Sequence, residues 1–352
     1  MASIRDSFPA LVRGERKGLA PALLRRALWG LQWPYALGTV IRNRRYDRGW
    51  ATIHRVPCPI VSVGNLTLGG TGKTPCVEAI ARWYRDQGLT VAILSRGYGS
   101  ESGRNDEAML LEENLPDVPH LQGADRASLA LTAVEELESE LLILDDGFQH
   151  RRLHRDLDIV LIDATRPLDR ESIFPRGMLR EPISNLARAD VLLLTRCDQA
   201  EKSSVDRQEA WLRERFPRAT LARAIHAPQD LISTDDRTES IESLKGRSVV
   251  AFCGLGNPEA FRATLTSLGA RVLQLRTFPD HHPYARADVE SLQSWVQSFP
   301  ADVWVITSQK DFVKLRIAEL SGRPLWALRI GMEFIQGAEA LHERLAAVVT
   351  PG

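Results

Sequence analysis

The stretch that most constrains this chain runs from Ile60 to Thr74 and reads IVSVGNLTLGGTGKT. A run of apolar residues leads into a glycine-rich turn, a Lys-Thr pair and a helical pattern. Glycines let backbone N–H groups approach phosphates, and the dipole of a following helix favours negative charge at its N-terminus. The stretch therefore predicts a strand, a phosphate-binding loop (P-loop) and a helix, and with them a site for a nucleoside triphosphate.

The loop is a variant of the G-x-x-x-x-G-K-[ST] pattern, because Thr67 stands where that pattern has its first glycine. We expect Gly69 and Gly70 to supply the tight turn instead. In such loops the lysine, here Lys73, reaches the β- and γ-phosphates, and the hydroxyl of Thr74 binds Mg²⁺. The alternative is a strand-to-helix turn whose glycines serve packing alone, and the Gly-Lys-Thr sequence at the junction disfavours it.

Length, charge and cysteine content narrow the class of protein. At 352 residues the chain is long enough for two domains. Its 45 Lys and Arg residues balance 45 Asp and Glu residues, so nucleic acid is not expected as a partner. Four scattered cysteines without C-x-x-C spacing argue against a disulfide framework or a zinc knuckle and fit a reducing compartment.

The N-terminal region is rich in arginine around an apolar, aromatic stretch, Ala27–Ile41, which contains Trp29, Trp33 and Tyr35. The stretch is shorter than the roughly 20 apolar residues that cross a bilayer, and Pro34 interrupts it. Aromatic residues between arginines are typical of a segment in the headgroup region, which would place the nucleotide site on the cytoplasmic side. The alternatives are a helix packed on the protein's own core and a signal peptide, which would need a clear small-x-small cleavage site.

From residue 60 onward, short apolar runs alternate with helical stretches, which predicts a doubly wound parallel sheet in an α/β fold. The strands expected first are Ile60–Val63, Val91–Leu94, Leu141–Leu144, Ile159–Ile162 and Val191–Leu194. After a polar stretch at 234–240, a second, smaller α/β unit is expected, with strands at Ser248–Phe252, Arg271–Leu275, Val303–Ile306 and Leu325–Leu328. We therefore expect a membrane-associating segment over 1–50, a P-loop domain over 51–233 and a C-terminal α/β domain over 241–352.

Two acidic pairs are candidates for chemistry. The pair Asp145-Asp146 follows the strand Leu141–Leu144 directly, at the position where P-loop proteins orient Mg²⁺ or its water. The pair Asp106-Glu107 offers a carboxylate, the usual base for taking the proton of an acceptor hydroxyl in phosphoryl transfer. The alternatives are a cap and turn at the first pair and a solvated loop at the second.

A third polar cluster, Asp280-His281-His282, is interpreted either as a turn or as a metal site. Two neighbouring histidines on a loop seldom coordinate one ion well, so no zinc site is predicted. The nearby Gly254-Leu-Gly256 sequence lacks the rest of a dinucleotide fingerprint, and we interpret it as a packing turn.

Seven motifs in sequence order resemble those of the tetraacyldisaccharide 4′-kinase family, the lipid A kinases of Gram-negative bacteria. They are Gly64–Pro75, Ser95–Tyr98, Asp106-Glu107, Asp145–His150, Met178–Pro182, Phe278–His281 and Lys310–Lys314. The likeness covers nearly the whole chain. Such kinases use MgATP to phosphorylate the 4′-hydroxyl of tetraacyldisaccharide 1-phosphate, which forms lipid IVA. The resemblance thus implies a phosphotransferase with ATP and Mg²⁺ as cofactors, a lipid A disaccharide 1-phosphate substrate, and a peripheral location on the cytoplasmic face of the bacterial inner membrane.

The resemblance also implies roles for individual residues. The expected nucleotide-binding residues are Gly69, Gly70, Thr71, Gly72, Lys73, Thr74, Gln149 and His150. The expected metal-binding residues are Thr74, Asp145, Asp146 and Glu107. Asp106 is expected to be the catalytic base, paired with His281, and Lys73 completes the catalytic set. Tyr98 and Arg126 fall where the family meets its nucleotide or its substrate.

The chain departs from the family pattern in three places. Asn105 and Ala108 flank the acidic pair in place of glycine and proline, and Leu168–Glu171 replaces a Phe-Gly-Asn-Gly type of loop that bears on sugar contacts. Gln309 stands where a glutamate is usual.

The competing function is a membrane-surface switch ATPase, which would share the glycine-rich loop, the basic segment and the sheet. Such proteins often have a lysine where this chain has Leu68, and they lack the second α/β unit. A GTPase fits less well, because Thr195–Asp198 only faintly resembles the guanine-reading Asn-Lys-x-Asp sequence.

Overall fold

The computed structural model describes residues 8, 11–12, 14, 17–97, 106–235 and 237–350. The chain forms two compact units. Unit 1 comprises Met1–Arg96, Val118–Ile225 and Glu333–Gly352, and unit 2 comprises Gly97–Asp117 and His226–Met332. Two long strands, β7 (Thr220–Ile232) and β13 (Arg323–Gln336), contribute residues to both units. The division therefore differs from the linear one expected from the sequence, because each unit is assembled from separate segments.

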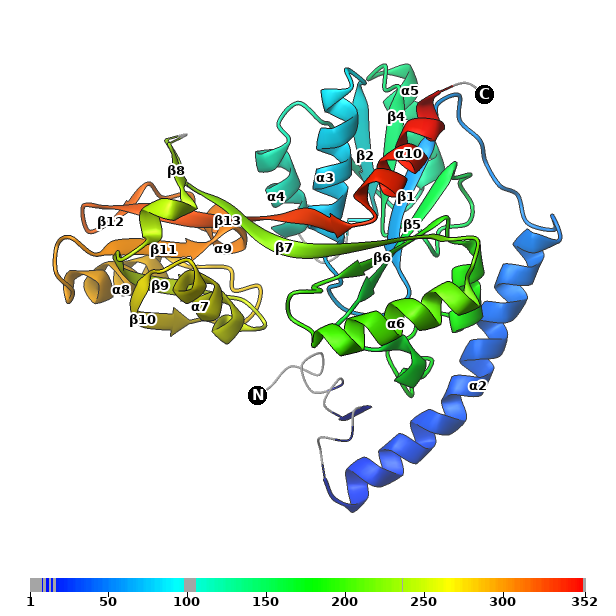
Figure 1. The fold of residues 1–352 in the computed structure, drawn as a ribbon, viewed down its shortest axis with the longest axis horizontal. Coiled ribbons are helices and arrows are strands. Elements are labelled where there is room, and N and C mark those ends of the chain that lie inside the picture. Colours follow the sequence, from blue (N-terminus) through cyan, green and yellow to red (C-terminus); the bar gives the residue numbers. More distant parts are fainter. Residues whose placement is uncertain are drawn as a thin grey trace. The chain divides into compact units, whose positions relative to one another are not determined.

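Unit 1 is built on a parallel sheet with strand order β7-β6-β5-β1-β4-β2-β3 (Figure 1). The strands before β7 are β1 (Ile60–Asn65), β2 (Val91–Ser95), β3 (His120–Gln122), β4 (Leu141–Asp145), β5 (Leu157–Asp163) and β6 (Val191–Thr195). Every residue of β1, β2, β4, β5 and β6 is buried, as expected for apolar strands in a sheet covered on both faces. The predicted α/β fold with a parallel sheet is confirmed, and the five strands expected in this unit are present.

Besides the N-terminal helix α2 (Leu19–Asp47), the helices described in unit 1 are α3 (Lys73–Asp86), α5 (Arg126–Glu135), α6 (Lys202–Arg215) and α10 (Ala338–Val349), with 3-10 turns at Leu168–Arg170 and Ile183–Arg188. The hydroxyl of Tyr84 in α3 donates to the carbonyl of Leu345 at 2.8 Å, and the ring of Trp83 stacks on His342 at 5.6 Å. Helix α10 therefore packs on α3, which explains why Glu333–Gly352 belongs to this unit and not to the second one.

Unit 2 has a smaller parallel sheet in the order β10-β9-β11-β13. Its strands before β13 are β8 (Thr238–Ser240), β9 (Ser248–Cys253), β10 (Arg271–Thr277), β11 (Trp304–Ser308) and β12 (Glu319–Leu320). Its helices are α4 (Asp106–Asn114), α7 (Pro258–Ser267), α8 (Arg286–Gln297) and α9 (Gln309–Leu315), with a 3-10 turn at Ile241–Leu244. The side chains of Asn114 and Gln309 exchange buried hydrogen bonds of 2.6 and 3.4 Å, which join α4 to α9 and place the segment around Asp106 in this unit.

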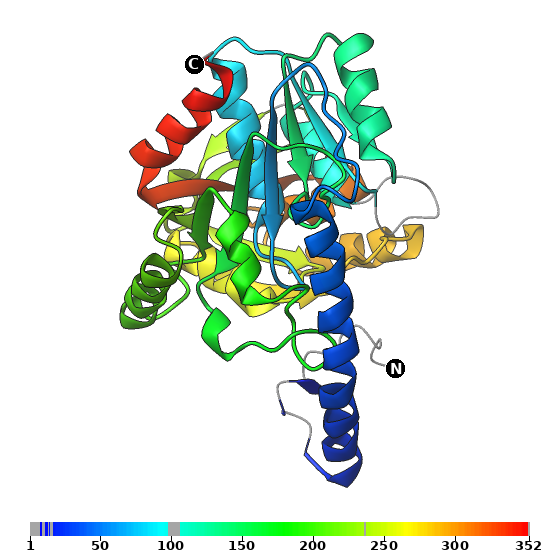
Figure 2. The same ribbon diagram turned by 90° about the vertical axis from the view of Figure 1, so that its right-hand side faces the viewer.

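The N-terminal helix α2 (Leu19–Asp47) contacts the rest of unit 1 mainly through its C-terminal half (Figure 2). Asn43 and Arg42 donate to the carboxylate of Glu181 at 2.7 and 3.2 Å. Further toward the N-terminus, the hydroxyl of Tyr35 donates to the carbonyl of Arg180 at 3.1 Å. These contacts fix the helix beside the segment that contains Arg180 and Glu181.

The apolar residues of α2 are largely uncovered. Trp29 is 57% exposed, Trp33 62% and Leu23 65%, and only Thr39 and Asn43 of this helix are buried. The alternative of a helix whose apolar residues pack on the protein's own core therefore does not describe this segment. Among the described residues, no helix combines the length and the apolar run that a membrane crossing requires.

Candidate active site

The loop between β1 and α3 has the backbone of a glycine-dependent turn. Gly69 has φ of 105° and Gly72 has φ of 88°, a region that side chains with a Cβ rarely adopt. Gly69 thus provides the turn expected of it, whereas Gly70 does not have a positive φ. Thr67 also lies outside the positive-φ region, which explains how a threonine replaces the first glycine of the pattern.

Neighbouring elements hold the loop in place. The side-chain amide of Asn65 donates to the carbonyl of Gly69 at 3.3 Å, and the hydroxyl of Thr195, at the end of β6, donates to the carbonyl of Thr71 at 2.9 Å. The backbone N–H of Leu68 donates to the carbonyl of Met178 at 2.7 Å. These three contacts fix the loop from two sides, and none of them involves the N–H groups of Thr71 to Thr74, the groups expected to face phosphate.

A charged cluster lies at the start of α3. Lys73 Nζ is 3.6 Å from Asp146 Oδ1, and one guanidinium nitrogen of Arg180 donates to both oxygens of Asp146 at 2.8 and 2.9 Å. Burial alone would raise the pKa of Asp146, but Lys73, Arg180 and Arg126 together hold it below its ordinary value. Asp146 is therefore ionised, and its left-handed backbone, φ of 52°, presents it to these cations.

Oxygen donors suited to Mg²⁺ gather in the same unit. Thr74 is buried in the first turn of α3, and Asp145 is buried at the end of β4. Burial, and to a lesser extent the charge of Asp145, raise the pKa of the Cys76 thiol in α3. Hydroxyl and carboxylate oxygens are the hard ligands that Mg²⁺ prefers, and the metal usually completes its shell with water and substrate phosphates. The hydroxyl of Thr74 and the carboxylate of Asp145 fit such a partial shell. Among the described residues, no cluster of three or more His, Cys, Asp or Glu side chains could hold a metal.

Three other predicted residues lie near this cluster. Gln149 donates to the carbonyl of Asn65 at 3.0 Å and accepts from Arg180 at 3.3 Å, so it connects the loop to the charged cluster. Burial and the nearby Arg126 lower the pKa of His150 to about 4, and its ring is therefore neutral at pH 7. Arg126, the first residue of α5, is buried, and the charges of Asp145 and Asp146 act on it.

The second constellation is in unit 2. His281 Nδ1 donates to Asp106 Oδ2 at 2.9 Å, and Lys314 Nζ lies 2.8 Å from the same oxygen. Burial alone would raise the pKa of Asp106, but the hydrogen bonds from His281 and Lys314 lower it to about 2. The hydrogen bond to Asp106 in turn raises the pKa of His281. The structure thus pairs the residue expected to be the base with the expected histidine, and adds a lysine.

The predicted site residues divide between the two units. Unit 1 contains Gly69, Gly70, Thr71, Gly72, Lys73, Thr74, Arg126, Asp145, Asp146, Gln149 and His150. Unit 2 contains Asp106, His281 and Glu107, which is exposed on α4. The expected substrate contact Tyr98 lies outside the described residues. Sequence reasoning assigned no role to Arg180 or Lys314, although both lie in motifs that carried the family resemblance.

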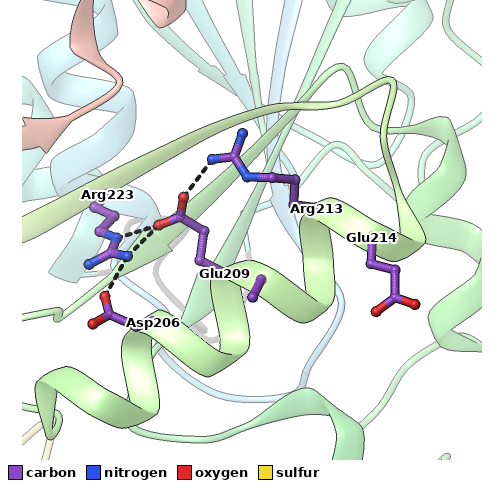
Figure 3. A pocket seen from close by; sticks show the side chains of 6 residues that line it. Asp206, Glu209, Arg213, Glu214 and Arg223 are labelled. Atoms are coloured by element: carbon purple, nitrogen blue, oxygen red, sulfur yellow. Dashed lines mark hydrogen bonds and ion pairs between the residues drawn. The ribbon is translucent and has the colours of Figure 1, made fainter.

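Two of the hollows on unit 1 differ in the residues that line them. One lies beside the P-loop and is lined by Thr67 to Thr71 together with Leu168 and Glu171, so the loop that departs from the family pattern borders the P-loop. The other, of about 380 Å³, lies between α6 and β7 (Figure 3). There Glu209 accepts from Arg213 at 2.6 Å and from Arg223 at 2.5 Å, so its carboxylate charge is compensated within the cluster. We assign no chemistry to this second hollow.

Comparisons with known proteins agree with the motif order. A model of the family described as "Tetraacyldisaccharide-1-P 4′-kinase" matches residues 24–350. A tetraacyldisaccharide 4′-kinase of Anaeromyxobacter dehalogenans is 38% identical, with 94% of this chain and 93% of the relative covered. The corresponding protein of Bdellovibrio bacteriovorus is 32% identical, with 93% of this chain and 100% of the relative covered.

A solved structure is similar as well. The "apo" form of LpxK from Aquifex aeolicus, described as a complex with ATP, is 31% identical and superposes with a TM-score of 0.76. The match covers 93% of this chain and 100% of that one. Together these findings confirm the resemblance inferred from the seven motifs.

Proposed function

Because the chain belongs to the tetraacyldisaccharide 4′-kinase family, we propose that unit 1 binds MgATP while Asp106 of unit 2 activates the sugar hydroxyl that receives the phosphoryl group. The chain is a kinase of lipid A biosynthesis, and its acceptor is the 4′-hydroxyl of tetraacyldisaccharide 1-phosphate. The interpretations as a switch ATPase or a GTPase are set aside by this membership.

The nucleotide half of the reaction rests on the P-loop, the observation that carries the proposal. Free backbone N–H groups and the N-terminus of α3 bind phosphate oxygens, and Lys73 neutralises charge on the group in transfer. Thr74 and Asp145 would hold Mg²⁺, which neutralises charge that develops on the phosphate oxygens when it is bound. Arg180 lies against Asp146 and keeps that carboxylate ionised and oriented.

The acceptor half rests on Asp106. As the bond between phosphorus and the sugar oxygen forms, the O–H bond breaks and the proton passes to the carboxylate, while ADP leaves with the electrons of the broken P–O bond. A carboxylate with a pKa of about 2 is a weak base, but it is fully ionised at neutral pH. In a loose transition state the main demands are position and charge, which a fixed carboxylate meets. His281, hydrogen-bonded to it, orients the carboxylate and is placed to receive the proton afterwards.

The exposed apolar side of α2 is proposed to lie on the cytoplasmic face of the inner membrane. A tetraacylated substrate resides in a bilayer, so the enzyme must work at its surface. Trp29 and Trp33 are exposed and arginines flank them on both sides, the composition of a segment at the headgroup level. Each basic residue near an anionic surface contributes on the order of 1 kcal/mol, and salt weakens the attraction.

The proposal is tested by transfer of labelled phosphate. Purified protein is incubated with labelled ATP, Mg²⁺ and tetraacyldisaccharide 1-phosphate in detergent micelles, and a bis-phosphorylated lipid is expected. ATP hydrolysis that does not depend on the lipid, with no labelled lipid formed, would contradict it. Vesicles of anionic lipid test the membrane contact separately: the double variant Trp29→Ser, Trp33→Ser should sediment less with them, with a loss that grows with salt. Sedimentation equal to that of the unaltered protein would refute the contact while leaving the kinase assignment intact.

A further inference from the structure

The motif Lys310–Lys314 helped to identify the family, yet nothing in the proposed reaction uses it. Its last lysine is the feature of interest. Lys314, in α9, is only 8% exposed, and its ammonium lies 2.8 Å from Asp106 Oδ2. It also donates to the carbonyl of His282 at 3.3 Å and lies 3.9 Å from Asp311 Oδ1. An ammonium has three donors, and this one is surrounded by three acceptors.

The carboxylate of Asp311, which lies near Lys314, is fixed in place. Asp311 is completely buried, and its other oxygen accepts from the backbone N–H of Gly254 at 2.9 Å and from the hydroxyl of Ser308. Gly254 allows the close approach, because a Cβ there would lie 3.0 Å from Asp311 Oδ1 and 2.9 Å from a backbone oxygen. The ammonium of Lys314 thus lies between two carboxylates, at 3.9 Å from the fixed Oδ1 of Asp311 and at 2.8 Å from Oδ2 of Asp106.

The two partners of Asp106 differ in how exposed their side chains are and in the element that carries them. The side chain of His281 is 61% exposed and its backbone has φ of 58°, so it reaches Asp106 from a strained, solvent-facing loop. Lys314 comes from a helix, and only 8% of its side chain is exposed. Both contacts are made to Oδ2 of Asp106, and the residues that the structure describes make no contact with Oδ1. The second oxygen is thus left available for a hydroxyl.

We propose that Lys314 is a positioning residue for phosphoryl transfer: it anchors Oδ2 of Asp106 so that Oδ1 faces the acceptor hydroxyl. The inference rests on the proposed role of Asp106 as the base. Lys314 does not touch the reacting atoms; it acts through the carboxylate. It also keeps Asp106 ionised, together with His281, whose own charge is influenced by Asp280 and Lys310.

The test measures turnover in the variants Lys314→Met and Lys314→Gln. The matched control is Lys245→Met, which alters an exposed lysine of the same unit. We expect kcat for lipid phosphorylation to fall about 10- to 100-fold in both Lys314 variants, a part of the 10²- to 10⁴-fold that a base contributes. The KM for ATP should stay unchanged in both Lys314 variants, and the control variant should keep the kcat of the unaltered protein. Thermal unfolding identifies any variant that has lost its fold, and the glutamine variant, which retains a donor, is the less disruptive of the two.

Non-additivity separates positioning from a structural role. In an Asp106→Asn background, Lys314→Met should reduce kcat by less than about twofold further, because the group it positions is already lost. Multiplicative losses, or a folded Lys314→Met enzyme with normal kcat, would overturn the inference. If the unaltered enzyme transfers phosphate and Asp106→Asn is equally active, the proposed base is wrong; that result is distinct from failure at Lys314 alone.

Discussion

Glu181 provides a quantitative test of how α2 is attached. Its side chain is fully buried and accepts from four side chains: Asn43 and Asn185 at 2.7 Å each, Arg188 at 3.1 Å and Arg42 at 3.2 Å. In Glu181→Ala the guanidinium of Arg188, which is largely buried, loses its carboxylate. Breaking a buried ion pair by removing one partner costs about 3–5 kcal/mol.

Each kcal/mol lowers Tm by about 2–4 °C in a domain of 150–250 residues, so we expect a decrease of about 6–20 °C for Glu181→Ala. Differential scanning calorimetry measures it directly. Glu181→Gln, which keeps the shape and part of the hydrogen bonding, should lose less. The exposed Glu214→Ala is the matched control and should change stability by less than about 0.5 kcal/mol. A loss below about 1 kcal/mol for Glu181→Ala would refute the idea that this buried carboxylate anchors the helix.

Three further predictions concern catalysis. Lys73→Ala should lower turnover at least about a hundredfold with the fold retained, since it removes a charge from the group in transfer; near-normal rates in the phosphate-transfer assay would contradict the P-loop assignment. Asp106→Ala and His281→Ala should each lower kcat strongly with little change in KM for ATP, and the double variant should be scarcely worse than the poorer single one; fully multiplicative losses would make His281 an independent contact. Asp106→Asn should lower the pKa of His281, measured by NMR, because the hydrogen bond with Asp106 is the largest cause that raises it. The pair therefore contributes fully to folding stability at pH values below 6.5, the ordinary pKa of histidine, and this contribution is lost as the pH rises through the raised pKa of the folded state.

Local signals explain what the sequence predicted well. The strands of unit 1 are apolar on both faces, so runs such as Leu141–Leu144 were recognisable without any partner. Lys73 and Asp145 were recognised by similar local signals, since each follows an apolar strand, and the structure places them at the start of α3 and at the end of β4; their roles remain proposals. The division into units was not predictable in this way, because it depends on contacts such as that between Asn114 and Gln309, which lie 195 positions apart.

Long-range pairing also explains what sequence reasoning missed in the site. Arg180 and Lys314 are ordinary basic residues in sequence and gain significance only from the carboxylates they meet, Asp146 and Asp106. Gln309 illustrates the same limit: it was noted as a departure from the family pattern, and the structure shows a buried amide pair with Asn114 in its place. The partner of Gln309 is distant in sequence and is identified only by the fold.

Because α10 packs on unit 1 but is synthesised after unit 2, unit 1 stays incomplete until the end of translation. Roughly a hundred residues of unit 2, His226–Met332, leave the ribosome before the helix that packs on Trp83 and Tyr84. At about 5–20 residues per second, the nucleotide-binding unit waits about 5–20 s with this face of α3 uncovered, although its P-loop was made early. The later unit can fold while the earlier one is still incomplete. A nascent chain of this kinase therefore presents the face around Trp83 and Tyr84 to chaperones, at the end of α3 that lies away from the P-loop.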